Sequence, residues 1–308
     1  MKGYKGFDPD FKCNSKQYAE NTEYEEKGGA ICGAGVMHFC ETPLDVLDYY
    51  PLLNNECKLN RFAEVTALAD VQAEGNKRAT KKIRIGAEFS FKDFIKAAVN
   101  VCIERTSKDA KASGDYSQLA ASGNSSQLAA SGYYSKLAAS GNSSQLAASG
   151  DYSKLAASGY YSKLAASGNS SKLAASGDYS QLAASGDYSK LAASGYYSQL
   201  AASGDYSQLA ASGDYSQLAA SGNSSKLAAS GDYSQLAASG DYSVAAGIGI
   251  NNIAKCALGG FIVLAEWTYE NGNYIPINVK AAKVDGETIK PDTWYRLVKG
   301  EFVEVENA

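Results

Sequence analysis

A nine-residue unit recurs along the middle of the chain, from Ser113 to Ala246, and it constrains the fold more than any other feature. The unit reads Ser-Gly-(Asp/Asn/Tyr)-(Tyr/Ser)-Ser-(Gln/Lys)-Leu-Ala-Ala. Fourteen full copies are followed by a fifteenth that decays at Val244. A unit this short cannot bury an apolar face alone, so neighbouring units must stack into a solenoid. Two units, each with one strand and one turn, would make a coil of eighteen residues.

The alternation of side chains along a strand separates an inward set of places in the unit from an outward set. If the leucine at the seventh place points inward, the serine at the fifth and the alanine at the ninth do so too. These three never vary among the full copies, whereas the third, fourth and sixth places do. The pattern therefore predicts a mainly β fold, a parallel β-solenoid with a thin core. The expected core leucines are Leu119, Leu128, Leu137, Leu146, Leu155, Leu164, Leu173, Leu182, Leu191, Leu200, Leu209, Leu218, Leu227 and Leu236.

Stacked coils place like residues above like residues, so tyrosine at the outward fourth place predicts exposed ladders. Glycine at the second place is expected to give the turn its positive φ, helped by the Asp or Asn that follows. The inward serines are expected to hydrogen-bond up and down the stack. The expected binding face consists of Tyr116, Tyr134, Tyr152, Tyr161, Tyr179, Tyr188, Tyr197, Tyr206, Tyr215 and Tyr233.

Three other interpretations of the repeat fit less well. In a helix, nine residues make two and a half turns, so successive leucines would face opposite sides. Disorder is the main alternative, because Gly, Ser and Ala are typical of flexible linkers. The calcium-binding β-roll shares the period alone, because its Asp stands two places before the apolar residue and Ser occupies that place here.

The repeat divides the 308 residues into three expected parts, 1–112, 113–246 and 247–308. The pattern of residues 1–112 predicts a small α+β domain that ends in a helix from Ser90 to about Thr106. The last predicts an antiparallel sheet with a hairpin turn at 271–273. A solenoid exposes unpaired backbone at both ends, so we expect the two flanking parts to cap those ends.

The charge of the chain and the spacing of its cysteines argue against two kinds of ligand, nucleic acid and metal ions. The formal net charge is −4, and the repeat itself carries eight Asp and six Lys, so no nucleic-acid partner is expected. The six cysteines lie outside the repeat without C-x-x-C spacing, and the chain has one histidine, so no metal site is expected. The opening residues contain no apolar run, which predicts no signal peptide and no membrane span.

The flanks contain three distinctive segments: 2–8 (KGYKGFD), HFCE at 38–41 with PLDV at 43–46, and 290–295 (KPDTWY). With these segments, both flanks resemble an uncharacterised family of bacterial and phage proteins. Members of that family often carry short Gly-Asp-Tyr-Ser-type repeats between the same flanks. The resemblance implies a shared architecture, and it implies no activity. Since no signal peptide is expected, free thiols and a location in the bacterial cytoplasm or with a phage are expected.

His38 is the natural candidate for chemistry, although its simplest interpretation is a half-buried strand residue. A strand with His38, a short helix ending at 49–50 and a strand with Glu64 resemble ADP-ribosyltransferase folds, which hold NAD with a His, a Tyr and a Glu. That resemblance implies an enzyme domain with the solenoid as a spacer. Cys40 is a weaker candidate nucleophile, because no third group is evident to orient His38.

These observations favour a structural or interaction protein rather than an enzyme, with no cofactor. Its Tyr and Gln/Lys ladders would contact another protein or further copies of the chain, and repeated flat faces suit many weak identical contacts. Ice binding by a flat face is the third hypothesis. The outward rows are bulky Tyr and charged Lys, however, rather than small hydroxyl-methyl residues.

Overall fold

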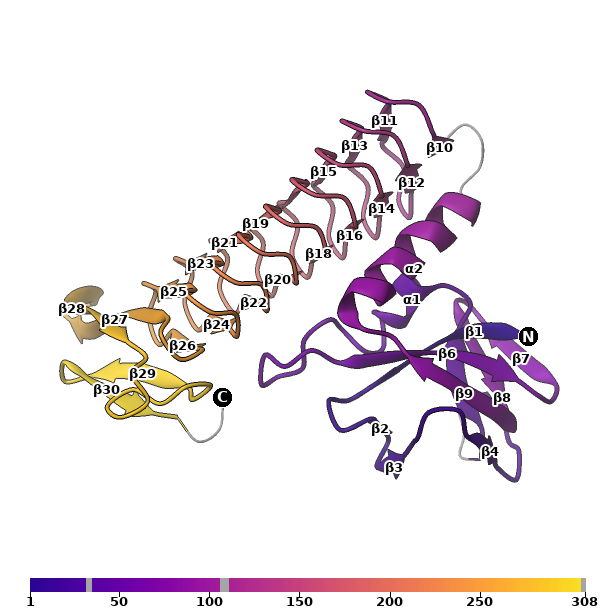
Figure 1. Ribbon diagram of the computed structural model, residues 1–308, viewed down its shortest axis with the longest axis horizontal. Coiled ribbons are helices and arrows are strands. Elements are labelled where there is room, and N and C mark those ends of the chain that lie inside the picture. The colour runs from indigo at the N-terminus through magenta and orange to yellow at the C-terminus, as the bar shows by residue number, and fades with distance from the viewer. Residues whose placement is uncertain (32–34, 106–110, 306–308) are drawn as a thin grey trace.

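A computed structural model of the protein describes residues 1–31, 35–105 and 111–305. It confirms the predicted fold class: the repeat forms a parallel β-solenoid with eighteen residues per coil (Figure 1). Consecutive strands alternate between two sheets, so each strand pairs with the one two units further along, as Leu137 does with Leu155. Of the helices in the described ranges, none is both long and apolar enough to cross a membrane.

The strands of even-numbered units form one sheet, here called the covered sheet because the N-terminal part packs on it. It contains β10 (Lys111–Ala112), β12 (Gln127–Ala130), β14 (Gln145–Ala148), β16 (Lys163–Ala166), β18 (Gln181–Ala184), β20 (Gln199–Ala202), β22 (Gln217–Ala220), β24 (Gln235–Ala238) and β26 (Ile253–Cys256). The strands of odd-numbered units form the open sheet. It contains β11 (Gln118–Ala121), β13 (Lys136–Ala139), β15 (Lys154–Ala157), β17 (Lys172–Ala175), β19 (Lys190–Ala193), β21 (Gln208–Ala211), β23 (Lys226–Ala229) and β25 (Val244–Gly247).

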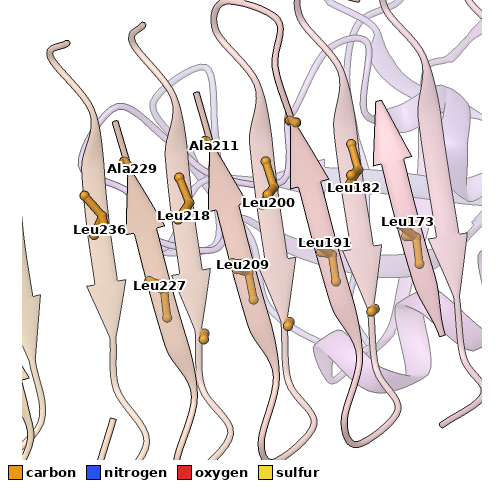
Figure 2. Close-up of a cluster of buried hydrophobic side chains, with 14 of the residues drawn as sticks. Leu173, Leu182, Leu191, Leu200, Leu209, Ala211, Leu218, Leu227, Ala229 and Leu236 are labelled. Atoms are coloured by element: carbon orange, nitrogen blue, oxygen red, sulfur yellow. The ribbon is translucent and has the colours of Figure 1, made fainter. Parts of the chain in front are cut away.

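The core between the two sheets follows the predicted inward set. The leucines form the row that Figure 2 shows, and from Leu128 to Leu236 each is at most 2% exposed. The fifth-place serines from Ser135 to Ser243 are fully buried. Leu119 is half-buried, because it lies in the first coil, where β11 has a neighbour on one side alone. Each coil of two units therefore buries two leucines and two serines between the two sheets.

The turn differs from expectation in which residue has positive φ. The fourth-place Tyr or Ser adopts it, with φ of 57° at Tyr116 and 57° at Ser125, while the repeat glycines do not. Glycine is required for space instead, because a Cβ at Gly186 would lie 2.3 Å from the carbonyl oxygen of Gly168 in the preceding coil. The close stacking of coils, rather than a left-handed glycine, explains why the second place never varies.

Two polar ladders stabilise the turns. Each buried fifth-place serine donates within its own unit, as Ser189 Oγ does to the Gly186 carbonyl oxygen at 2.7 Å, and not mainly along the stack as expected. The third-place carboxylate or amide accepts from the backbone one coil further on, as Asn169 Oδ1 does from Asp187 N at 2.9 Å. Both arrangements satisfy backbone groups that the tight turn leaves free.

The N-terminal part contains a seven-stranded sheet in the order β4-β9-β6-β1-β5-β8-β7. Its strands are β1 (Lys2–Phe7), β4 (Glu23–Glu25), β5 (Met37–Cys40), β6 (Arg61–Ala67), β7 (Val71–Glu74), β8 (Lys77–Thr80) and β9 (Lys82–Glu88), and a small hairpin pairs β2 (Lys12–Cys13) with β3 (Lys16–Gln17). Two helices follow the sheet strands, α1 (Pro43–Val46) and α2 (Phe91–Arg105). Ser90 caps α2 as predicted, since its Oγ accepts from Asp93 N at 3.1 Å, and the expected end at Thr106 lies outside the described residues.

The N-terminal part lies along the flank of the solenoid and not over its end as expected. Helix α2 crosses β12, β14, β16 and β18 of the covered sheet (Figure 1). Its apolar residues share one buried cluster with the eighth-place alanines of that sheet, among them Ala129 and Ala165. A flat, uniform sheet offers a larger apolar contact than the end of a thin coil, which explains the lateral position.

The C-terminal part caps the solenoid by extending each sheet with an antiparallel hairpin. The open sheet continues into β27 (Phe261–Glu270) and β28 (Asn273–Lys283), joined by the predicted turn. The covered sheet continues into β29 (Tyr295–Val298) and β30 (Glu301–Glu304). These hairpins belong to two sheets rather than to the single antiparallel sheet expected, because each one pairs with the last coil of its own sheet.

Candidate binding surface on the open sheet

The sixth place of the unit is sorted between the two sheets. On the open sheet it is mostly lysine, namely Lys136, Lys154, Lys172, Lys190 and Lys226, all exposed. On the covered sheet it is glutamine in every full unit except Lys163. Because alternate units fall on opposite sheets, counting odd and even copies separately would have revealed this sorting from the sequence. The prediction treated Gln and Lys as one ladder and missed it.

Glutamines of the covered sheet hydrogen-bond to the backbone of the N-terminal part. Gln181 Nε2 donates to the Leu47 carbonyl oxygen at 3.2 Å, and Gln199 Nε2 donates to that of Leu53 at 3.1 Å. Gln217 does the same with Asn54 at 3.0 Å. A neutral amide can both donate to and accept from a covering loop without a buried charge, which suits an internal interface.

The open sheet presents three parallel rows to solvent. The sixth-place row carries the lysines, the eighth-place row carries alanines, and the serines that begin the next units form the third row. Two shallow and mainly apolar grooves follow these rows along the sheet from Gln118 to Ile248. Within the described residues, no segment of the N-terminal part packs on this side, so the eighth-place alanines from Ala120 to Ala228 stay exposed.

The tyrosines form ladders along the two edges of the solenoid and do not lie on its sheet faces. All ten candidates are 43–69% exposed, because the fourth place falls in the turn before each strand. One edge carries an unbroken stack from Tyr161 through Tyr179, Tyr197 and Tyr215 to Tyr233, with ring centroids 5.0–5.1 Å apart. Such contacts offset the cost of a left-handed tyrosine, which is on the order of 1 kcal/mol.

The opposite edge carries shorter stacks beside the lysine row. Tyr116, Tyr134 and Tyr152 stack with centroids 5.1 and 4.8 Å apart, and Tyr188 stacks on Tyr206 at 4.9 Å. Serines at the fourth place of the intervening coils interrupt this edge. The shorter stacks therefore border the lysine row of the open sheet. The longer ladder lines a groove beside the glutamines of the covered sheet and the N-terminal part, including Leu47 and Pro51.

The enzyme candidates of the N-terminal part lie apart from this surface. His38 and Cys40 are on β5 and line a pocket of about 410 Å³ together with Lys5. Glu64 is on β6, beyond β1, where it forms an ion pair with Lys2 at 2.8 Å and does not line that pocket. The structure therefore brings two of the three candidates together.

Burial favours the neutral form of both pocket groups. Burial lowers the pKa of His38, whose Nε2 hydrogen-bonds the Ile31 carbonyl oxygen. Burial, with the charges of Asp45 and Asp48, raises the pKa of the Cys40 thiol to about 12. A nucleophilic cysteine needs the opposite shift, because the thiolate is the reactive form. The pocket therefore does not support Cys40 as a nucleophile. Of the NAD-binding alternative, His38 and Tyr49 line the pocket, and Glu64 does not.

Comparison with known proteins found a match for the N-terminal part of the chain. A protein-family model described as "Domain of unknown function (DUF7666)" matches residues 1–97, which include the seven-stranded sheet and the first half of α2. No curated protein and no solved structure matches the chain. The N-terminal part is thus similar to an uncharacterised domain, and the description of that domain names no activity.

Proposed function

We propose that this protein is an interaction protein whose N-terminal part stiffens the solenoid while the open sheet binds another protein. One observation carries the proposal. Two sheets built from the same unit differ in cover: Ala129 and Ala147 of the covered sheet are fully buried by the protein itself, and the matching Ala138 and Ala156 of the open sheet are exposed. A long, exposed, partly apolar face is typical of a protein interaction site.

The charge of the open sheet favours a different protein over a second copy as the partner. Face-to-face pairing of two open sheets would bring two lysine rows together, and like charges opposite one another are destabilising. The tyrosines at the edges add amphipathic contact area of the kind enriched at protein interfaces. Repetition along the sheet gives many equivalent contacts, so modest local affinities add up.

Site-specific photo-cross-linking tests the proposal. A photoreactive amino acid replaces Ala174 on the open sheet, or Leu68 on the N-terminal part as a matched control that is 43% exposed. In extracts of the organism that encodes the chain, we expect a discrete cross-linked protein with Ala174 and none with Leu68. The cross-link should disappear in an Ala156→Glu/Ala192→Glu variant that melts at the same temperature.

Other outcomes would contradict the proposal. Equal cross-linking from both positions, or a cross-link that survives the double substitution, would show that the open sheet is not the binding surface. A product at twice the chain mass of 32.4 kDa would show self-association instead.

A further inference from the structure

Helix α2 shows what the alanine row of a solenoid sheet can bind. The helix lies across four strands of the covered sheet, along the solenoid axis (Figure 1). Its buried residues are Phe94, Ile95, Ala98, Val99 and Cys102. They share a cluster with Ala129, Ala147, Ala165 and Ala183, which are at most 3% exposed. The small side chains of the eighth place therefore form a seat for an amphipathic helix.

The repeat of the solenoid matches the repeat of a helix in this orientation. An α-helix rises about 5.4 Å per turn, and neighbouring strands of a sheet lie about 4.8 Å apart. Each turn of α2 therefore meets roughly one strand, and its buried residues recur at 94–95, 98–99 and 102. Any helix with apolar residues at this spacing fits the same row over three or four turns.

The open sheet presents the same seat without an occupant among the described residues. Ala138, Ala156, Ala174 and Ala192 lie in register on successive strands, as the alanines under α2 do. Their neighbours at the seventh and ninth places are the same Leu and Ala as on the covered sheet. The two seats thus differ chiefly in the row beside them, which is lysine on the open sheet.

The sixth-place residue indicates what the covering segment must carry. On the covered sheet, Gln181, Gln199 and Gln217 meet backbone groups. Gln145 donates to the Asp45 carboxylate, and the single lysine, Lys163, forms an ion pair with Asp48. On the open sheet, Lys136, Lys154, Lys172 and Lys190 stand next to one another on adjacent parallel strands. Like charges so close repel, and none of the ion pairs among the described residues includes any of these lysines.

We propose that the open sheet binds an amphipathic, acidic α-helix of a partner protein, laid along the Ala138–Ala192 row as α2 lies on the covered sheet. This inference rests on the proposed function and specifies its partner. The helix carries small or apolar residues at i, i+3/i+4 and i+7, and Asp or Glu along one flank. The sixth and eighth places are two residues apart, or about 7 Å along the strand, so the lysines reach the flank of a helix seated on the alanines.

Two stapled peptides test the inference with the full-length protein. Both peptides carry the α2 sequence with Cys102 replaced by Ala. They differ on one flank of the helix, at the positions of Lys92, Lys96 and Ile103. These three positions are Glu in one peptide and Lys in the other. Fluorescence anisotropy measures binding at low and high salt. We expect the Glu peptide to bind at least tenfold more tightly than the Lys peptide, and less tightly as salt increases.

Variants of the open sheet separate charge from shape. Lys154→Glu/Lys172→Glu should reverse the preference between the two peptides. Ala156→Phe/Ala174→Phe should weaken the Glu peptide at least tenfold by filling the seat, with the melting temperature unchanged. Lys81→Glu/Lys92→Glu on the N-terminal part, where both lysines are exposed, is the matched control and should leave the affinity unchanged.

The inference is overturned by any of three results. The first is that the Glu peptide does not bind the wild-type protein at about 1 mM. The second is that the Ala156→Phe/Ala174→Phe variant binds the Glu peptide as tightly as wild type does. The third is that single-stranded DNA binds as tightly as the Glu peptide and that this variant does not weaken DNA binding. The last would identify a site for polyanions in general. If a partner is cross-linked at position 174 but the peptide does not bind, the helix inference is wrong and the proposed interaction role stands. If both experiments fail, both the helix inference and the proposed function are wrong.

Discussion

Lys163 of the solenoid forms an ion pair with Asp48 of the N-terminal part, and its ammonium also donates to the Leu44 carbonyl oxygen at 2.9 Å. The lysine side chain is 7% exposed and the aspartate side chain is 44% exposed. Lys163 is the one lysine among the full units of the covered sheet. A buried ammonium is costly unless a carboxylate and a further acceptor satisfy it, and here the covering segment supplies both.

Breaking this pair should destabilise the protein unequally from its two sides. Asp48→Asn leaves a buried ammonium without its counter-charge and should cost about 2 kcal/mol. Lys163→Gln restores the residue found elsewhere on the covered sheet and should cost less than about 1 kcal/mol. Urea denaturation of both variants and of the double variant checks this, and equal losses for the two single variants would contradict it.

The repeat glycines should differ in importance according to their place in the stack. Gly186→Ala would put a Cβ 2.3 Å from the Gly168 carbonyl oxygen and should destabilise the protein by more than about 3 kcal/mol. Gly114→Ala is the matched control, because its nearest neighbour is Ser117 Oγ at 3.7 Å in the first coil. That variant should stay within about 1 kcal/mol of wild type. Thermal unfolding of both variants measures the difference, and similar losses would refute a steric role for this glycine.

The effect of a deletion within the repeat should depend on whether it removes a whole coil of eighteen residues. Removing 176–193 keeps every later unit on its own sheet, so the protein should fold, although contacts such as Cys57 Sγ with the Leu218 carbonyl oxygen shift by one coil. Removing 176–184 moves every later unit to the other sheet and places Lys190 against the N-terminal part. The shorter deletion should therefore melt at a clearly lower temperature, measured by circular dichroism. Equal melting temperatures would argue against this arrangement.

Alkaline pH should weaken the fold through its buried thiols. Burial raises the pKa of Cys40 and of Cys57 to about 12, whereas a cysteine in an unfolded chain titrates near about 8.5. The unfolded state therefore loses these protons first. The stabilisation is complete below about pH 8.5 and declines toward pH 12, by about 1.4 kcal/mol per pH unit for each thiol.

Melting temperatures from pH 7 to 10, in reducing buffer, measure this decline. Cys57→Ala should show a shallower pH dependence than wild type, because one raised thiol is gone. If both proteins lose stability at the same rate, this thiol does not contribute to the alkaline sensitivity.

Much of the solenoid could be read from its period. The invariance of Ser, Leu and Ala at the fifth, seventh and ninth places identified the core, since strand alternation alone assigns those places inward. The turn was assigned less well, because a glycine that is needed for space and one that is needed for positive φ look identical in a sequence. Tyr116 and its equivalents instead adopt the left-handed conformation, supported by stacking between coils.

The candidate binding surface depended on contacts far apart in the chain. The local pattern identified the outward rows, but it did not separate the odd-numbered copies of the unit from the even-numbered ones. The assignment of Lys172 to an exposed row and of Gln181 to a covered one follows from where the N-terminal part docks. Docking depends on complementarity between segments more than a hundred residues apart, such as Lys163 and Leu44.

The sequence by itself determined the coil, its core and the existence of tyrosine ladders, because short-range alternation and an exact repeat leave few ways to bury the leucines. Tertiary structure alone decided which sheet is covered and which stays open. The physical reason is that both sheets present equivalent alanine rows. The sorting of Lys and Gln distinguishes the two sheets, and only the docking of α2 and of the loop at 47–54 decides which one is covered.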